Sequence, residues 1–331
     1  MKKYLICLSV LVLLMCLLCS CKSAQEEKNK KENEPVQIVT TVFPEYDWVQ
    51  NIIASNPGGM EVTLLVDNGV DLHSYQPSVD DIIKITDCDM FIYVGGESDK
   101  WVSDALAQTS NKNRTVISLL DILGDSVREE EETEGMQSEE KAEDGEDKED
   151  GPEYDEHVWL SLKNASKIVD KISECLQKLD EKNAAVYREN TAAYKEKLNV
   201  LDEEYTALTK DAPVKTLLFG DRFPFLYLTK DYGLSYYAAF PGCSAETEAS
   251  FNTITFLSEK LNSLSLPAVL TIENSDAEIA ETIVETSGKA DVKILAMNSA
   301  QSVTSKDIKD GVTYLSIMKD NLEVLKTALG K

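Results

Sequence analysis

One long stretch without any strand signal divides this chain into two parts. Residues 164–179 within it are amphipathic, and residues 183–210 are good helix formers with neither Gly nor Pro. At about 1.5 Å per residue, a helix over residues 183–210 would span roughly 42 Å. We therefore predict a helical connector at residues 161–211 that is long enough to join two separate lobes.

The segments on either side of this connector alternate between strand-like and helix-like patterns. Such alternation is typical of a parallel sheet with helices on both faces. The predicted fold is α/β, with an N-terminal lobe at residues 35–160 and a C-terminal lobe at residues 212–331, joined by the long, rigid connector. Ligands of such folds bind outside the carboxyl ends of the strands, here in the cleft between the lobes. The expected strands are residues 37–42, 62–66, 90–94 and 115–118, then 216–219, 236–240, 268–272 and 293–296.

The N-terminus has the features of a signal peptide followed by a lipid attachment site. Two lysines precede an apolar stretch that ends in Leu18-Cys19-Ser20-Cys21. This stretch is shorter than the roughly 20 residues of a spanning helix, so we expect cleavage. The small Ser20 favours cleavage ahead of Cys21, which would carry the lipid. Residues 1–20 would then be the signal peptide and residues 21–34 a tether that holds the protein outside the cytoplasm, on the cell membrane.

The remaining cysteines of the mature chain are Cys88, Cys175 and Cys243, far apart and without a C-x-x-C motif. This spacing indicates neither a disulfide framework nor a thiolate zinc ribbon. At most one disulfide can form. A catalytic cysteine would need a histidine partner, and both histidines of the chain have a better explanation.

The formal net charge of −26 is unevenly distributed. Residues 129–156 hold sixteen Asp or Glu and two Lys. Because such a run has little apolar surface to bury, we expect an acidic, disordered loop that the fold does not need. No basic residues cluster, which argues against a nucleic-acid partner.

Only two histidines occur, His73 and His157, and both follow acidic residues. Imidazole is a common ligand of zinc, and a neighbouring carboxylate can orient the ring through its second nitrogen. His73 follows the strand at residues 62–66, and His157 precedes the connector, so both can lie at the cleft. We predict a metal site there; the alternative is that each histidine only caps a local turn.

Several motifs along the chain carry a family resemblance. They are the lipobox, Asp71-Leu72-His73-Ser74-Tyr75-Gln76-Pro77-Ser78, Val94-Gly95-Gly96-Glu97, Asp155-Glu156-His157-Val158-Trp159-Leu160, the long helix, and Phe225-Leu226-Tyr227 before Tyr232-Gly233-Leu234. Through them, and over essentially the whole mature chain, the protein resembles the solute-binding lipoproteins of zinc and manganese ABC transporters, the cluster A-I metal binders. The resemblance implies that His73 and His157 are metal ligands of the first lobe, that the partner is a membrane permease, and that the protein is a monomer.

The ligands of the second lobe depart from the family pattern. An ungapped count back from Tyr227 places Arg222 at a ligand position of the family. Arginine cannot bind a metal because it stays protonated. Asp221 is the better candidate, unless it only forms an ion pair with Arg222. The family's fourth ligand falls near Asn298, whose carbonyl oxygen is a weak donor, and Glu273 could substitute for it.

Two imidazoles with oxygen ligands suit Zn²⁺, and Mn²⁺ is the alternative. The expected function is capture of a divalent metal for an ABC importer, with a metal-binding adhesin or a degenerate binder as rivals. An enzyme, such as a metal-dependent hydrolase, is not expected because no H-E-x-x-H and no G-x-S-x-G motif occur.

Overall fold

The computed structural model describes residues 35–107, 111, 113–137, 153–244 and 248–331. Residues 37–331 form one compact unit. The expected signal peptide, the tether to residue 34 and Cys21 lie outside the described residues. Within the described part of the chain, no helix combines the length and the apolar character that crossing a bilayer requires.

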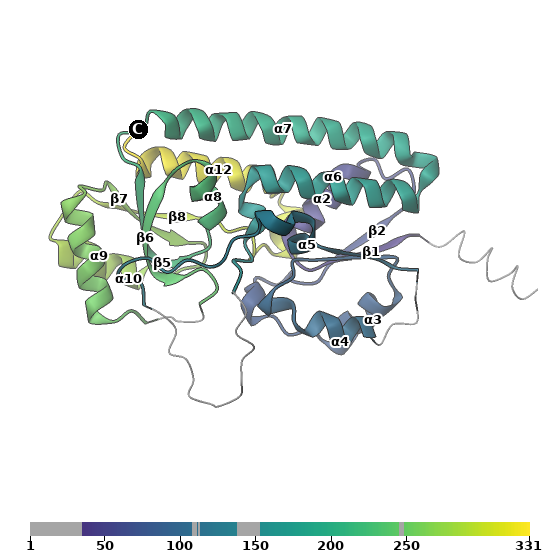
Figure 1. The fold of residues 1–331 in the computed structure, drawn as a ribbon, viewed down its shortest axis with the longest axis horizontal. Helices are drawn as coiled ribbons and strands as arrows, with labels where there is room; N and C mark the ends of the chain where they lie inside the picture. The colour runs from purple at the N-terminus through teal and green to yellow at the C-terminus, as the bar shows by residue number, and fades with distance from the viewer. Residues whose placement is uncertain (1–34, 108–110, 112, 138–152, 245–247) are drawn as a thin grey trace, which may run out of the picture. The chain divides into compact units, whose positions relative to one another are not determined.

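The first lobe is built on a parallel four-stranded sheet in the order β2-β1-β3-β4 (Figure 1). Its strands contribute to a hydrophobic core that includes Ile38, Val39, Phe91 and Ile92, all almost fully buried. The strands are β1 (Gln37–Thr40), β2 (Glu61–Leu64), β3 (Met90–Tyr93) and β4 (Thr115–Ser118); the helices are α2 (Phe43–Ile53), α3 (Val79–Asp87), α4 (Trp101–Ala107) and α5 (Leu119–Leu123).

The second lobe repeats this plan with the parallel order β6-β5-β7-β8. Strand β5 is longer than the sequence indicates, and its register with β6 shifts between Phe219 and Arg222. Such an irregularity re-aims the side chains that follow it. The strands are β5 (Thr216–Phe223), β6 (Ser235–Pro241), β7 (Ala268–Ile272) and β8 (Lys293–Met297); the helices are α8 (Leu226–Asp231), α9 (Phe251–Ser263), α10 (Glu278–Ser287), α11 (Ser305–Lys309) and α12 (Tyr314–Ala328).

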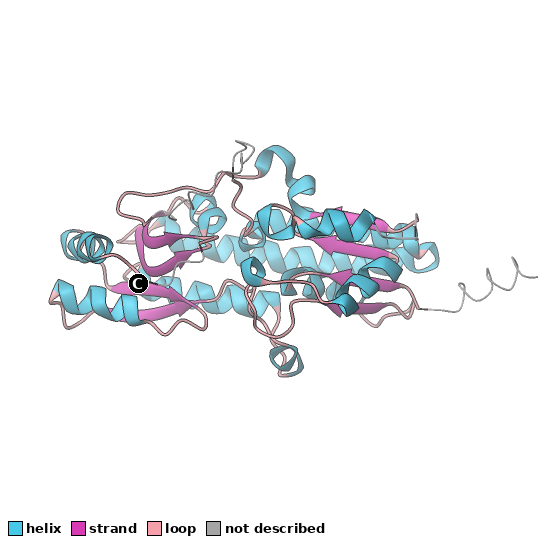
Figure 2. Ribbon diagram, turned by 90° about the horizontal axis from the view of Figure 1, so that it is seen from below, coloured by secondary structure: helices cyan, strands magenta, loops and turns pink. Residues whose placement is uncertain are grey.

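The predicted connector is confirmed as two helices, α6 (Leu162–Leu179) and the 27-residue α7 (Ala184–Lys210), which runs along one side of both sheets (Figures 1 and 2). The Tyr194 hydroxyl donates to Asp47 of α2 at 3.2 Å, in the first lobe. The Tyr205 hydroxyl donates to the Met318 carbonyl of α12 at 2.5 Å, in the second lobe. One helix is thus bonded to both lobes.

The ends of the acidic segment differ from the disordered loop that the sequence predicts. Glu129 and Tyr154 form an antiparallel bridge, and the Gln137 amide donates to the Ala239 carbonyl of β6 at 2.9 Å. Because β6 is an edge strand, its main chain offers unpaired groups that this segment satisfies without apolar burial. The prediction counted only apolar side chains, and it was wrong for residues 129–137 and 153–156; residues 138–152 lie outside the described residues.

Helix α2 begins at Phe43, and the Glu45 side chain bonds back to the residues that precede it. One Glu45 oxygen accepts from the Thr41 and Val42 amides at 2.9 and 3.3 Å. The other oxygen is buried, with no hydrogen-bond partner in the described part of the chain. Burial, and then the Asp99 carboxylate, raise the pKa of Glu45 to about 8.

This shift predicts that Glu45→Gln changes how stability depends on pH. Between the ordinary value of 4.5 and about 8, the native state keeps a proton that the unfolded chain has lost. The free energy of unfolding therefore falls as pH rises through this window. The difference in free energy of unfolding between the variant and the unmodified protein should therefore shift in favour of the variant by on the order of a few kcal/mol from pH 5 to pH 8. Urea unfolding at both pH values measures this; parallel pH profiles would contradict it.

Candidate metal site

His73 lies in a short 3-10 helix, Leu72–Ser74, beyond the carboxyl end of β2. The Asp71 side chain begins this helix by accepting a hydrogen bond from the His73 amide at 2.9 Å. The His73 Nδ1 lies 2.7 Å from the Ser98 hydroxyl and 3.5 Å from the buried Glu156 carboxylate. These contacts leave Nε2 as the nitrogen that faces the cleft.

His157 immediately precedes the 3-10 helix Val158–Leu160 and is fully buried. One oxygen of Asp155 accepts from the His157 amide at 2.8 Å and lies 3.2 Å from its Nδ1. The ring also packs edge-on against Trp159, with 5.4 Å between the ring centroids. Two carboxylates, one behind each histidine, thus orient the rings as in many metal sites.

The two Nε2 atoms point at each other and lie 3.2 Å apart, although the residues are separated by 84 positions. Two nitrogens that bind one tetrahedral zinc at about 2.0–2.1 Å lie roughly 3.3 Å apart. The fold therefore brings the two histidines together, at a spacing that suits a shared ion. The alternative that each only caps its own turn does not explain this convergence.

Cys243 joins the two histidines to form a group of three candidate ligands, the metal group. Among the described residues, the ligand atoms of His73, His157 and Cys243 all lie within 4.8 Å of one another. Cys243 follows the carboxyl end of β6, and the turn is so tight that a Cβ on Gly242 would meet the Phe223 carbonyl at 2.8 Å. The Cys243 amide donates to the Glu130 carboxylate at 2.9 Å.

Cys243 was not predicted as a ligand because the cysteines were considered only as disulfide partners, C-x-x-C ligands or catalytic nucleophiles. A usable signal was present. Cys243 follows the strand expected at residues 236–240, as His73 follows the strand expected at residues 62–66. The carboxyl ends of parallel strands share one edge of a sheet, where ligands gather.

Asp221 does not belong to this group, contrary to the prediction that it is a metal ligand. Its two oxygens accept from the Arg222 and Ile272 amides at 2.8 and 3.3 Å, so the carboxylate braces the end of β5. The expected alternative, an Asp221–Arg222 ion pair, is not what the structure has either. The Arg222 guanidinium instead contacts Asp71 of the first lobe at 2.7 Å.

Asn298 and Glu273 both make hydrogen bonds within the second lobe, and the Glu273 carboxylate is not in the group. The Asn298 side-chain oxygen accepts from the Ala300 amide at 2.7 Å, inside its own turn. The Glu273 carboxylate accepts from the Ser299 amide and hydroxyl at 2.7 and 2.5 Å. The prediction of Asn298 as a fourth ligand followed the family pattern, which the hydrogen bonds of this loop do not support.

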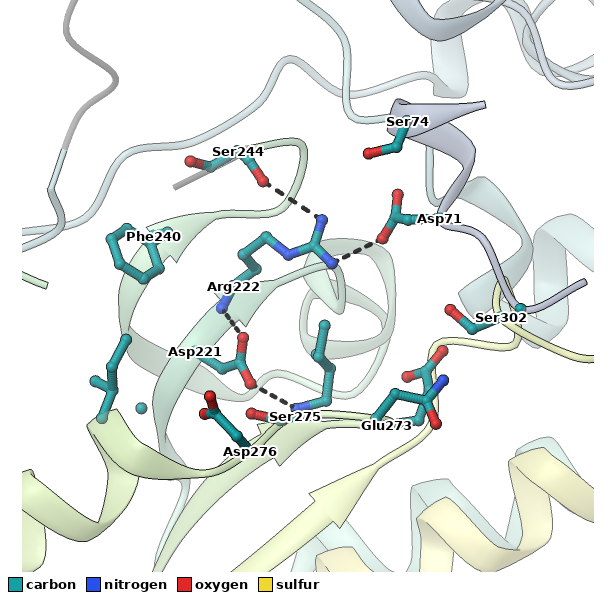
Figure 3. Close-up of a pocket in the computed structure, with 15 residues that line it drawn as sticks. Asp71, Ser74, Asp221, Arg222, Phe240, Ser244, Glu273, Ser275, Asp276 and Ser302 are labelled. Atoms are coloured by element: carbon teal, nitrogen blue, oxygen red, sulfur yellow. Dashed lines mark hydrogen bonds and ion pairs between the residues drawn. The ribbon is translucent and has the colours of Figure 1, made fainter. Parts of the chain in front are cut away.

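A cavity of about 380 Å³ lies next to the group, lined by both lobes (Figure 3). Four carboxylates line it, those of Asp71, Asp221, Glu273 and Asp276, against the single guanidinium of Arg222. This excess of negative charge attracts cations to the cleft.

The protonation state of His73 suits metal binding, whereas Cys243 must lose a proton first. Burial, and then the nearby His157 ring, lower the pKa of His73 to about 3, so this imidazole is neutral at pH 7. Burial and the Glu130 carboxylate raise the pKa of the Cys243 thiol well above its usual value, so a metal must displace its proton. Two imidazole nitrogens and one sulfur suit zinc, whereas manganese prefers oxygen ligands.

Asp155→Ala should lower the affinity for zinc about 10–100-fold, the usual cost of losing a partner that orients a ligand. Asp155 holds both the main chain and the ring of His157, so its loss frees the ring to rotate. Competition with a chromophoric chelator measures the change. Asp155→Asn keeps an oxygen acceptor and should lose less; equal affinity of Asp155→Ala and the unmodified protein would contradict this role.

The chain is similar in sequence to known zinc-binding proteins. The family model described as zinc-uptake complex component A, periplasmic, matches residues 38–328. The zinc-binding lipoprotein AdcA of Streptococcus pneumoniae is 31% identical over 334 residues, which cover 98% of this chain and 61% of that protein. The high-affinity zinc uptake system protein ZnuA of Bacillus subtilis is 26% identical over 313 residues, 94% of this chain and 91% of that protein.

Among solved structures, the Zn(II)-bound ZnuA-like domain of Streptococcus pneumoniae AdcA is similar, with a TM-score of 0.69 and 29% identity over 90% of this chain and 100% of that one. The chain spans about three fifths of the length of its AdcA relative. Since the family model covers most of the sequence, the chain belongs to the family of the periplasmic zinc-uptake component A.

Proposed function

We propose that this protein captures one zinc ion outside the cytoplasm and delivers it to the permease of an ABC importer. The observation that carries the proposal is the convergence of His73, His157 and Cys243 within 4.8 Å. The functions of its relatives, zinc binding and high-affinity zinc uptake, support the same conclusion. We further propose that a lipid on Cys21 anchors the protein to the membrane and that it acts as a monomer.

The proposed ligands are the Nε2 atoms of His73 and His157 and the sulfur of Cys243. With the thiol deprotonated, these ligands reduce the charge of the bound dication by one. The acidic cleft and the carboxylates of Asp155 and Glu156 supply the remaining negative charge nearby. This compensation is needed because a buried, unpaired charge is costly.

Calorimetric titration of the metal-free protein with zinc tests the proposal. One ion should bind per chain, with release of a proton from Cys243 that appears as a dependence of the measured heat on the buffer. Manganese should bind more weakly than zinc. A protein that binds no zinc, or that binds manganese more tightly, would contradict the proposal.

A further inference from the structure

Arg222 connects the two loops that carry the candidate ligands. Its Nη2 lies 2.7 Å from the Asp71 carboxylate, 151 residues earlier in the chain and in the other lobe. Its Nη1 donates to the Ser244 carbonyl at 3.4 Å. Asp71 precedes His73 by two residues, and Ser244 directly follows Cys243 (Figure 3). A single side chain thus contacts the loops on both sides of the metal site.

The Arg222–Asp71 pair is also built into the protein more firmly than a surface ion pair. The two side chains are only 19% and 17% exposed, which limits screening by solvent. The second Asp71 oxygen accepts from the His73 amide, so the pair is bonded to the His73 loop itself. On the other side, the Asp221 carboxylate accepts from the Arg222 amide after the register shift in β5. Both partners are therefore held by their own loops.

The charge of the pair matters next to a dication. An unpaired guanidinium beside the histidines would repel zinc, whereas the Asp71 carboxylate nearly cancels its charge. Separation of the lobes would break the pair and leave both charges without a partner in a partly buried cleft, which is unfavourable. The pair therefore opposes the opening movement through which a bound ion would leave.

We propose that Arg222 is a positioning residue that retains the metal, because its ion pair with Asp71 holds the His73 loop of the first lobe against the Cys243 loop of the second. The inference rests on the proposed function, since it concerns the release of the same ion. It gives a role to the arginine that stands where the family resemblance places a metal ligand.

Zinc release into excess chelator, followed by stopped flow, tests this inference. Arg222→Gln and Asp71→Asn should each release zinc about tenfold faster, within the usual range for coupled neighbours. Asp71→Asn keeps an oxygen for the His73 amide. The double variant should be no faster than the faster single variant, because both remove one interaction. Arg188→Gln, which loses a contact with Gln177 at the surface, is the control and should release zinc at the unmodified rate.

Three results would overturn the inference: release at the unmodified rate in Arg222→Gln, slower release in that variant, or a double variant whose effect is the product of the two single effects. Slower release would mean that Arg222 acts only by repelling the ion. The melting temperatures of the metal-free variants show whether they fold, and Arg222→Lys, expected to be intermediate, replaces a variant that does not.

If the unmodified protein binds no zinc, the proposed function fails, but the ion pair can still be tested. Hydrogen exchange of the metal-free protein should then be faster around residues 71–74 in Arg222→Gln than in Arg188→Gln. Equal exchange in the two variants would overturn the inference independently of zinc.

Discussion

Replacing Cys243 with serine should lower the affinity for zinc by more than about 100-fold, the upper end of what the loss of a supporting contact costs. The substitution removes the only sulfur in the group and leaves a hydroxyl, which does not ionise at neutral pH and is a poor ligand for zinc. The affinity is measured by competition with a chelator of known affinity.

Cys175→Ser is the matched control for this experiment. Cys175 lies in α6, is buried, and is not in the metal group. It should bind zinc as the unmodified protein does. An affinity of Cys243→Ser within threefold of the Cys175→Ser control would show that the sulfur is not a ligand.

The second large effect concerns stabilisation by zinc. Zinc at a thousandfold excess over its dissociation constant should raise the free energy of unfolding by roughly 4 kcal/mol. His157→Ala should lose nearly all of this gain at the same zinc concentration, because it removes one of two imidazoles. Thermal unfolding with and without zinc measures the gain.

Asp221→Ala tests whether Asp221 binds zinc, as the family pattern suggests, or only braces the end of β5, as in the structure. The metal-free variant should unfold more easily, by about 1–3 kcal/mol, because two main-chain amides lose their acceptor. Its gain in stability from zinc should match that of the unmodified protein. Loss of that gain in Asp221→Ala would indicate that Asp221 is a ligand after all and would contradict the arrangement described above.

The alternation of strands and helices was sufficient to predict the fold. Both four-stranded parallel sheets and the helical connector were expected from local patterns, because each residue's preference agrees with its neighbours over whole elements. The pairing of His73 with His157 was also predictable, since no other position offers an imidazole, and His73 follows a strand of the first lobe while His157 precedes the connector.

The second lobe's contribution could not be predicted in the same way. The register shift in β5 turns Asp221 toward main-chain amides and Arg222 toward Asp71, and Asp71 lies 151 residues earlier in the chain. The approach of Cys243 depends on where the turn after β6 lies relative to a loop 170 residues earlier. Similarly, the ordered ends of the acidic segment depend on the free edge of β6, which is a property of the folded sheet.

X-ray absorption spectroscopy at the zinc edge of the loaded protein tests the central claim most directly. The account predicts one sulfur at about 2.3 Å together with imidazole nitrogens at about 2.0–2.1 Å. In Cys243→Ser the sulfur contribution should disappear while the imidazole scattering remains. A spectrum of the unmodified protein that needs only nitrogen and oxygen neighbours, with no sulfur, would show that zinc is not held by His73, His157 and Cys243.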